Sequence, residues 1–149
     1  MKAKMISCGV LVTDGERLLL GHAPLSPRWD IPKGVAEPGE APVAAARREL
    51  FEETGLEAPE AELRPLGTFS YLPAKDLALF LWTPSAMPDP AALVCTSHFF
   101  WKGRQWPEFD HFGLFSRDEA LRLVGKNMAR VLAGIPLAPL GYDSCGASK

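Results

Sequence analysis

Three glutamates that lie close together carry the most visible chemistry in this chain. Glu49, Glu52 and Glu53 are spaced i, i+3 and i+4, and on a helix these positions share one face over a single turn. Like charges at this spacing destabilise a helix by roughly 0.2 to 0.5 kcal/mol per pair. Clustered carboxylates without Cys or His at ligand spacing suit Mg²⁺ or Mn²⁺ rather than zinc. Taken alone, this spacing favours a solvated acidic helix face.

A helix from about Pro42 to Thr54 would have to position these glutamates. Proline suits a first helical turn, where its missing N–H costs nothing, and Gly55 suits the left-handed residue after a helix end. Between them, Val43, Ala46 and Leu50 recur at helical spacing and predict a buried stripe. Glu52 and Glu53 would lie at the negative end of the helix dipole, where acidic side chains are unfavourable. Residues that oppose local stability in this way are typical of functional sites.

The residues around this helix resemble the signature of the Nudix hydrolases, the Nudix box. Residues 34–56, GVAEPGEAPVAAARRELFEETGL, fit the pattern G-x5-E-x7-R-E-U-x-E-E-x-G-U, where U is an apolar residue. Every defined position matches: Gly34, Glu40, Arg48, Glu49, Leu50, Glu52, Glu53, Gly55 and Leu56. In similar proteins the box forms a loop, a helix and a second loop that hold divalent cations against a pyrophosphate.

This resemblance implies a role for each box residue. Glu49 and Glu53 would be direct metal ligands, with Glu52 as a ligand or a water-held partner. The backbone carbonyl of Lys33, just before the box, would be a further ligand.

Other box residues would support the site rather than bind the metal. Glu40 and Arg48 would fix the loop and orient the glutamates. Gly34 and Gly55 are interpreted as backbone positions, where a side chain would obstruct the loop or the helix exit.

The flanks of the box add candidate residues for substrate binding and catalysis. Arg28 and Lys33 could meet substrate phosphates, and Trp29 could stack on a base or, as we favour, close the core. Glu108 lies in a Pro-Glu-Phe-Asp segment that resembles part of the bacterial RNA pyrophosphohydrolases and the dinucleoside polyphosphate hydrolases. There the glutamate is a metal ligand or a general base; an ordinary loop acid is the alternative. The candidate catalytic residues are Arg48, Glu52, Glu53 and Glu108, and the candidate metal ligands are Glu49, Glu52, Glu53, Glu108 and the Lys33 carbonyl.

The resemblance implies metal-dependent hydrolysis of a pyrophosphate linkage in a nucleoside diphosphate joined to another group. Bound Mg²⁺ neutralises the charge of such a linkage, lowers the pKa of a coordinated water and steadies the leaving phosphate. Dinucleoside polyphosphates are the leading substrates, followed by RNA 5′ ends, nucleoside triphosphates and nucleotide sugars. The branch stays open, because RNA pyrophosphohydrolases carry Gln where this chain has Lys33.

Two other functional classes share the expected fold. A non-catalytic nucleotide-binding sensor would usually have lost a box glutamate, and none is missing here. An isomerase of the isopentenyl diphosphate type would add Cys and Glu groups for carbocation chemistry, for which Cys95 alone is thin support. A hydrolase is the favoured interpretation.

The composition is that of a globular protein with one core. With 149 residues, 47% apolar and 23% charged, we expect one domain over residues 1–140 and a loose tail over 141–149. A net charge of −2 provides no general basic field for long nucleic acids or membranes, and no membrane partner is expected. Cys8, Cys95 and Cys145 lie far apart and indicate neither a disulfide framework nor a zinc site, so a reducing cytoplasm is favoured.

The order of elements predicts an α+β fold. Strands are expected over 5–12, 17–21, 63–71, 77–82 and 94–101, and helices near 118–124 and 126–132. Asp14-Gly15 signals a hairpin between the first two strands. The apolar run 77–82 suggests a strand buried on both faces, which needs helices on each side of the sheet. This agrees with the α/β/α sandwich around a mixed sheet that the resemblance implies.

Aromatic and basic residues alternate in the segment HFFWKGR over residues 98–104. Such interleaving could stack on and grip a nucleotide. A strand with an apolar face and a charged turn explains the pattern as well and is the favoured interpretation. The expected partner is a small nucleotide, and a homodimer stays open because similar proteins are often dimers.

Overall fold

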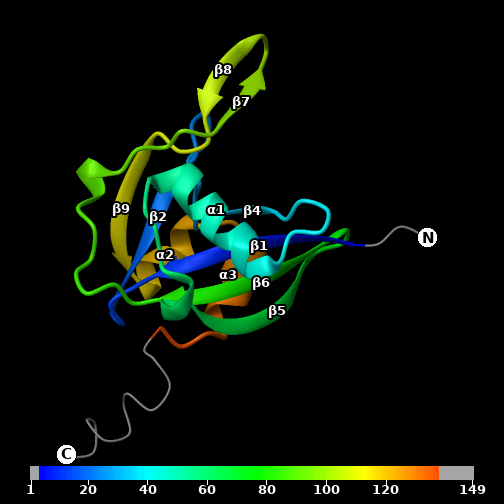
Figure 1. Cartoon of the computed structure of the whole chain (residues 1–149). Coiled ribbons are helices and arrows are strands. Elements are labelled where there is room, and N and C mark those ends of the chain that lie inside the picture. Colours follow the sequence, from blue (N-terminus) through cyan, green and yellow to red (C-terminus); the bar gives the residue numbers. More distant parts are fainter. Residues whose placement is uncertain (1–3, 138–149) are drawn as a thin grey trace, which may run out of the picture.

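The computed structural model describes residues 4–137, so the tail predicted for 141–149 and Cys145 lie outside the described residues. Figure 1 shows the elements along the chain. They are β1 (Met5–Val12), β2 (Arg17–His22), β3 (Trp29–Asp30), β4 (Lys33–Val35), α1 (Pro42–Thr54), η1 (Glu60–Glu62), β5 (Arg64–Leu72), β6 (Lys75–Trp82), η2 (Pro90–Ala92), β7 (His98–Trp101), β8 (Arg104–Pro107), β9 (His111–Ser116), α2 (Arg117–Leu123) and α3 (Lys126–Ala133). Within the described residues, none of the helices is long and apolar enough to span a bilayer.

A mixed four-stranded sheet in the order β4-β1-β6-β5 forms the centre of the fold. Strand β1 runs parallel to β6, whereas β4 and β5 pair antiparallel with their neighbours. A second sheet in the order β3-β2-β9 lies beside it, and β7 and β8 form a separate hairpin.

The hairpin predicted at Asp14-Gly15 is correct only at the turn. A single bridge joins Thr13 to Leu18, after which β2 leaves β1 and pairs with β3 and β9. Strand β6 pairs with the whole length of β1 on one edge, and β4 pairs with Ser7–Gly9 on the other.

Strand β6 is buried on both faces, as its apolar run predicts. Leu77, Leu79 and Leu81 belong to a core cluster that includes residues of α2 and α3. The alternate side chains belong to a second cluster with residues of α1. Figure 1 shows α1 on one side of the sheet and α2 and α3 on the other, so the expected α+β sandwich is confirmed.

The strand predicted over 94–101 begins only at His98. The preceding segment uses its backbone N–H groups elsewhere: Val94 donates to the carbonyl of Thr54 at 3.1 Å, and Thr96 donates to that of Glu52 at 2.7 Å. These carbonyls lie in the last turn of α1, where no helical partner is left for them. Residues 94–97 therefore bind the end of the helix instead of joining a sheet.

Candidate active site

Helix α1 spans Pro42–Thr54, as the sequence predicts. Gly55 ends it in the left-handed conformation, with φ of 84°, and donates its N–H to the carbonyl of Phe51 at 2.8 Å. Ala46 and Leu50 are fully buried against the sheet. The helix is thereby fixed with its carboxyl end beside the start of β4.

Glu53 is the most deeply placed of the three helix glutamates, with only 6% of the residue exposed. Its Oε1 accepts the backbone N–H of Lys33 at 3.1 Å. The Glu49 carboxylate lies against Gly34, at a point where any Cβ would overlap it. Glu52 lies nearer solvent, with 39% of its side chain exposed. The fold thus brings Glu49, Glu53 and the Lys33 backbone to one place.

Glu108, from a distant part of the chain, lies close enough to Glu53 for its charge to act on that carboxyl group. Burial raises the pKa of Glu53 well above that of an ordinary carboxyl group, and the charges of Glu49 and then Glu108 raise it further. Burial also raises the pKa of Glu49, against the opposing effect of the Arg48 guanidinium. Ionisation of these two carboxyl groups is therefore unfavourable with the protein's own cations alone.

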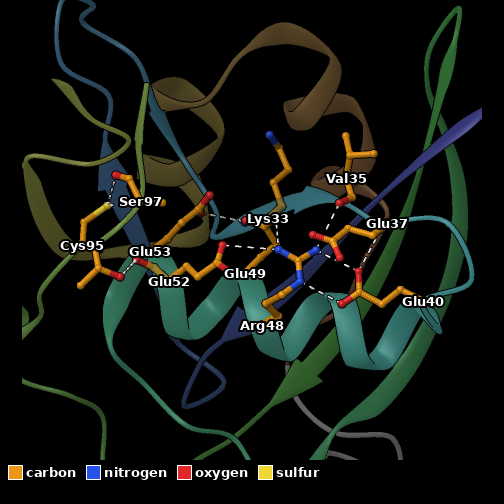
Figure 2. A network of polar contacts seen from close by, with 11 residues as sticks. Lys33, Val35, Glu37, Glu40, Arg48, Glu49, Glu52, Glu53, Cys95 and Ser97 are labelled. Atoms are coloured by element: carbon orange, nitrogen blue, oxygen red, sulfur yellow. Dashed lines mark hydrogen bonds and ion pairs between the residues drawn. The ribbon is translucent and has the colours of Figure 1, made fainter. Parts of the chain in front are cut away.

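Arg48 ties the box loop to the helix (Figure 2). Its Nε and Nη2 donate to the two carboxylate oxygens of Glu40, each at 2.9 Å, and Nη2 also donates to the carbonyl of Val35 at 3.3 Å. Its Nη1 donates to Glu49 at 3.1 Å. Hydrogen bonds from Arg48 and from the Glu37 backbone lower the pKa of Glu40 to about 2. The planar guanidinium of arginine is suited to donating two parallel hydrogen bonds to one carboxylate, as Arg48 does to Glu40.

We expect Arg48→Lys to raise the Mg²⁺ concentration needed for half-maximal hydrolysis by roughly 10- to 100-fold, the usual effect of losing a ligand's orienting partner. Lysine keeps the charge but cannot hold Glu40 and Glu49 together through one rigid fork. A Mg²⁺ titration of the initial rate measures this effect. Arg47→Lys is the matched control, because Arg47 bonds to the Ala58 carbonyl instead. Equal Mg²⁺ dependence in the two variants would contradict the positioning role of Arg48.

The three candidate substrate-binding residues lie in different surroundings. The ammonium group of Lys33 pairs with Asp30 at 3.0 Å and lies 5.8 Å from the Tyr71 ring centroid. Burial is the largest single effect and lowers the pKa of Lys33, but the effects of Asp30, Tyr71 and Glu53 together outweigh it, so that this pKa is raised. The Lys33 ammonium is therefore held by Asp30, while its backbone belongs to the carboxylate site.

Trp29 and Arg28 make their contacts with residues other than the helix glutamates. Trp29 is half-buried and packs edge-to-face on Phe115 at 4.9 Å and on His22 at 5.1 Å between ring centroids, which favours its role in the core. Arg28 is exposed, and its guanidinium lies beside Gly125 at the start of α3.

A polar cluster forms that the sequence pattern did not reveal. Nδ1 of His22 and Nδ1 of His111 lie 2.8 and 2.9 Å from the same Asp110 oxygen. His22 and His111 are cross-strand partners on β2 and β9, so their proximity depends on the pairing of two distant strands. The adjacent pair Asp110-His111 is the one signal that the sequence offers.

A cleft of about 820 Å³ opens beside Glu108, between residues 89–95 and 107–112. Pro107 and Phe109, which flank Glu108, are among the residues that line it, as is Cys95. Its volume falls within the roughly 300 to 1,000 Å³ of ligand pockets. A nucleoside-sized group therefore has room in this cleft, although none of the helix glutamates lines it.

Comparison with known proteins extends the likeness beyond the box. A family model described as the NUDIX domain matches residues 3–133. An uncharacterized 17.7 kDa protein of the e-segB intergenic region of Enterobacteria phage T4 is 34% identical over 144 residues, covering 89% of this chain and 95% of that protein. An RNA pyrophosphohydrolase of Bartonella clarridgeiae is 47% identical over 47 residues, which span 30% of this chain and 27% of that protein.

The fold is similar to that of solved structures as well. An Ap4A hydrolase of C. elegans, solved as a binary complex, matches with a TM-score of 0.61 and 21% identity, covering 85% of this chain and 92% of that one. A match that runs through nearly the whole chain, rather than through the box alone, shows that this protein belongs to the Nudix hydrolase family.

Proposed function

We propose that this Nudix hydrolase, which acts on pyrophosphate bonds, cleaves the linkage in a nucleoside diphosphate joined to another group, with dinucleoside polyphosphates as leading substrates. The observation that carries the proposal is the meeting of Glu49 and Glu53 beside the backbone of Lys33 and Gly34, with Glu108 near enough for its charge to act on Glu53. The fold shared with an Ap4A hydrolase supports the choice of substrate.

The residues fit Mg²⁺, or Mn²⁺ in its place. All the donors are oxygens, the ligand type that these hard cations prefer. The carboxylates lie partly buried with raised pKa values, while the nearby cations are committed to other partners, Lys33 to Asp30 and Arg48 chiefly to Glu40. Bound Mg²⁺ would supply the charge that attracts a pyrophosphate and would acidify a coordinated water.

Each side chain then has a separate task. Glu49 and Glu53 would hold the cation, together with the Lys33 carbonyl, and Glu52 would act from the more exposed edge as a ligand or through water. Glu108 would complete the ligand set or take the proton of the attacking water. Arg48 would position Glu49 through the contacts described above.

Glu108→Gln is expected to lower kcat by roughly 10- to 100-fold, within the usual contribution of a single general base. The amide keeps the shape of the side chain but cannot take a proton. Rates measured across the pH range test the role, because loss of a base should flatten the acidic limb of the profile. Asp89→Asn is the control, since Asp89 also lines the neighbouring cleft but lies outside the carboxylate site. A profile identical to that of the unmodified protein would argue against the base role.

The substrate class needs a direct screen. We would compare dinucleoside polyphosphates, 5′-triphosphate RNA, nucleoside triphosphates and nucleotide sugars with Mg²⁺ present, identifying products by mass. RNA 5′ ends are the second candidate, because an RNA pyrophosphohydrolase is 47% identical to this chain over 47 residues. Preferred cleavage of nucleotide sugars would overturn the leading assignment. Tight binding of these nucleotides without any turnover would instead identify a non-catalytic sensor.

A further inference from the structure

The hairpin of β7 and β8, residues His98–Pro107, forms an arm that projects from the body of the protein (Figure 1). Four residues of each strand pair antiparallel, from His98 opposite Pro107 to Trp101 opposite Arg104. Lys102 and Gly103 make the turn with φ of 51° and 76°, the positive values that favoured two-residue hairpin turns need. The arm is a regular structure rather than an irregular loop.

The aromatic side chains near the tip of the arm are exposed. Phe100 is 75% exposed and Trp101 54% exposed, so the apolar face that the sequence predicted for this strand does not pack on the body. As consecutive residues of β7 they lie on opposite faces of the arm, and large exposed apolar surface commonly marks a binding site.

The charges of the arm identify the kind of ligand. Residues 98–107 contain Lys102, Arg104 and His98 but no acidic residue, in a chain with 18 acidic residues. The Lys102 ammonium lies 5.7 Å from the Trp101 ring centroid, and the Arg104 guanidinium 4.8 Å from that of Trp106. Aromatic faces beside cations suit a base together with its phosphates. Two arms facing each other would instead bring like charges together.

Both ends of the arm are attached to the carboxylate site. Ser97, just before β7, donates its N–H to the Glu52 carbonyl at 3.2 Å and accepts the N–H of Glu108 at 3.0 Å. Strand β8 leads directly into Glu108. Four extended residues span ~13 Å, so a substrate held at the carboxylates could extend along the arm.

A second feature at the base of the arm is an unused donor. The indole Nε1 of Trp106 is buried and has no hydrogen-bond partner among the described residues. Buried donors are nearly always paired. Trp106 lies two positions before Glu108, so its N–H is a group that a ligand between arm and body could satisfy.

We propose that the arm binds the part of the substrate beyond the cleaved linkage, by stacking an unpaired base on Trp101 or Phe100 and pairing phosphates with Lys102 and Arg104. This inference rests on the proposed function and deepens it, because it requires a substrate with a base on the far side of the pyrophosphate. Such a base occurs both as the second nucleoside of a dinucleoside polyphosphate and in the first nucleotides of an RNA 5′ end.

Equilibrium binding tests the arm without turnover. Diadenosine tetraphosphate, a short 5′-triphosphate RNA and ATP are titrated in Ca²⁺, a cation that also takes carboxylate oxygens, with products checked to exclude hydrolysis. Since one stacked base contributes roughly 1–3 kcal/mol, Trp101→Ala or Phe100→Ala should raise Kd about tenfold for one or both of the first two ligands. ATP, which has no second base, should bind as before. If the variants raise Kd for only one of the first two ligands, that ligand shows whether the stacked base comes from a dinucleoside polyphosphate or from an RNA 5′ end.

Charge variants and controls complete the test. Lys102→Gln and Arg104→Gln should weaken the dependence of binding on salt, because each removes a phosphate contact. Phe51→Ala and Arg122→Gln are the matched controls: Phe51 is 48% exposed on α1, and Arg122 is exposed on α2. Neither lies on the arm, so neither should change Kd.

The outcomes separate this proposal from the proposed function. If Trp101→Ala weakens binding but no nucleotide is hydrolysed in Mg²⁺, the arm stands and the proposed function fails. The arm proposal is overturned if hydrolysis proceeds and the arm variants bind all three ligands with unchanged Kd. It is also overturned if these variants weaken ATP binding as much as they weaken binding of the other two ligands. A change from dimer to monomer in Trp101→Ala, with unchanged ligand binding, would also overturn it and make the arm an interface between copies.

Discussion

Glu53→Gln is expected to lower the rate of pyrophosphate hydrolysis by about 10³-fold while the chain stays folded. Metal-ion catalysis contributes several kcal/mol to such reactions, and ~4 kcal/mol corresponds to this factor. The Gln side chain can still accept the Lys33 N–H, which Glu53 accepts at 3.1 Å, but it loses the negative charge that would hold a cation. The steady-state rate at saturating Mg²⁺ measures the effect.

Stability should change little, or rise, in the same variant. Burial, with the charges of Glu49 and Glu108, raises the pKa of Glu53 in the folded chain. Ionised Glu53 therefore costs the folded state free energy as the pH rises above the ordinary carboxyl pKa, and Gln removes that cost. Thermal unfolding without metal should show a Tm equal to or above that of the unmodified protein.

Mg²⁺ should stabilise the unmodified protein and not the variant. Binding to the folded state alone adds about 2.7 kcal/mol at a hundred times Kd, so Tm should rise by several degrees. Glu57→Gln, at an exposed glutamate just beyond the helix, is the control and should keep both the rate and the Mg²⁺ effect. A Glu53→Gln variant with more than half the normal rate would show that Glu53 is not a ligand.

Gly34→Ala is expected to lower the hydrolysis rate by about 100-fold without unfolding the protein, comparable to losing a ligand's orientation. A Cβ at this position would overlap the carboxylate of Glu49. Because that carboxylate is the end of a flexible side chain, it can move away while the backbone stays in place. Once moved, it no longer faces Glu53. Rates across a Mg²⁺ titration and a thermal unfolding curve test both parts.

Gly134→Ala is the matched control for this substitution. Gly134 follows α3 with φ of −95°, which any residue can adopt, and a Cβ there would come no closer than 3.8 Å to the Val131 carbonyl oxygen. Its rate should equal that of the unmodified protein. A Gly34→Ala enzyme within twofold of normal would show that the space above Gly34 is not needed for Glu49.

The elements that the sequence predicts best are those with local signals. Helix α1 has Pro42 at its first turn and Gly55 after its end, and its observed bounds equal the predicted ones. Strand β1 also has the expected bounds, and the unbroken apolar run of β6 predicts correctly that both of its faces are covered. Each of these signals lies within the element itself.

The elements that were predicted wrongly depend on partners elsewhere in the chain. Residues 94–97 have an apolar start that suggests a strand, but their N–H groups bind the free carbonyls at the end of α1. Strand β2 follows a turn signal that suggests pairing with β1, but it pairs with β3 and with the distant β9. A hydrogen-bond partner that lies far away in the chain leaves no periodic pattern at the residues that use it.

The same difference separates the carboxylates from their surroundings. The spacing of Glu49, Glu52 and Glu53 on one helix is local, because 3.6 residues make a turn wherever that helix lies. Together with the other matching positions of residues 34–56 it carries the resemblance that predicts the family and the bond to be broken. The approach of Glu108 to Glu53, the space over Gly34 and the exposed rings of Phe100 and Trp101 depend on packing between segments distant in the chain. Such packing follows from the complete set of long-range contacts, so no stretch of sequence read singly could predict it.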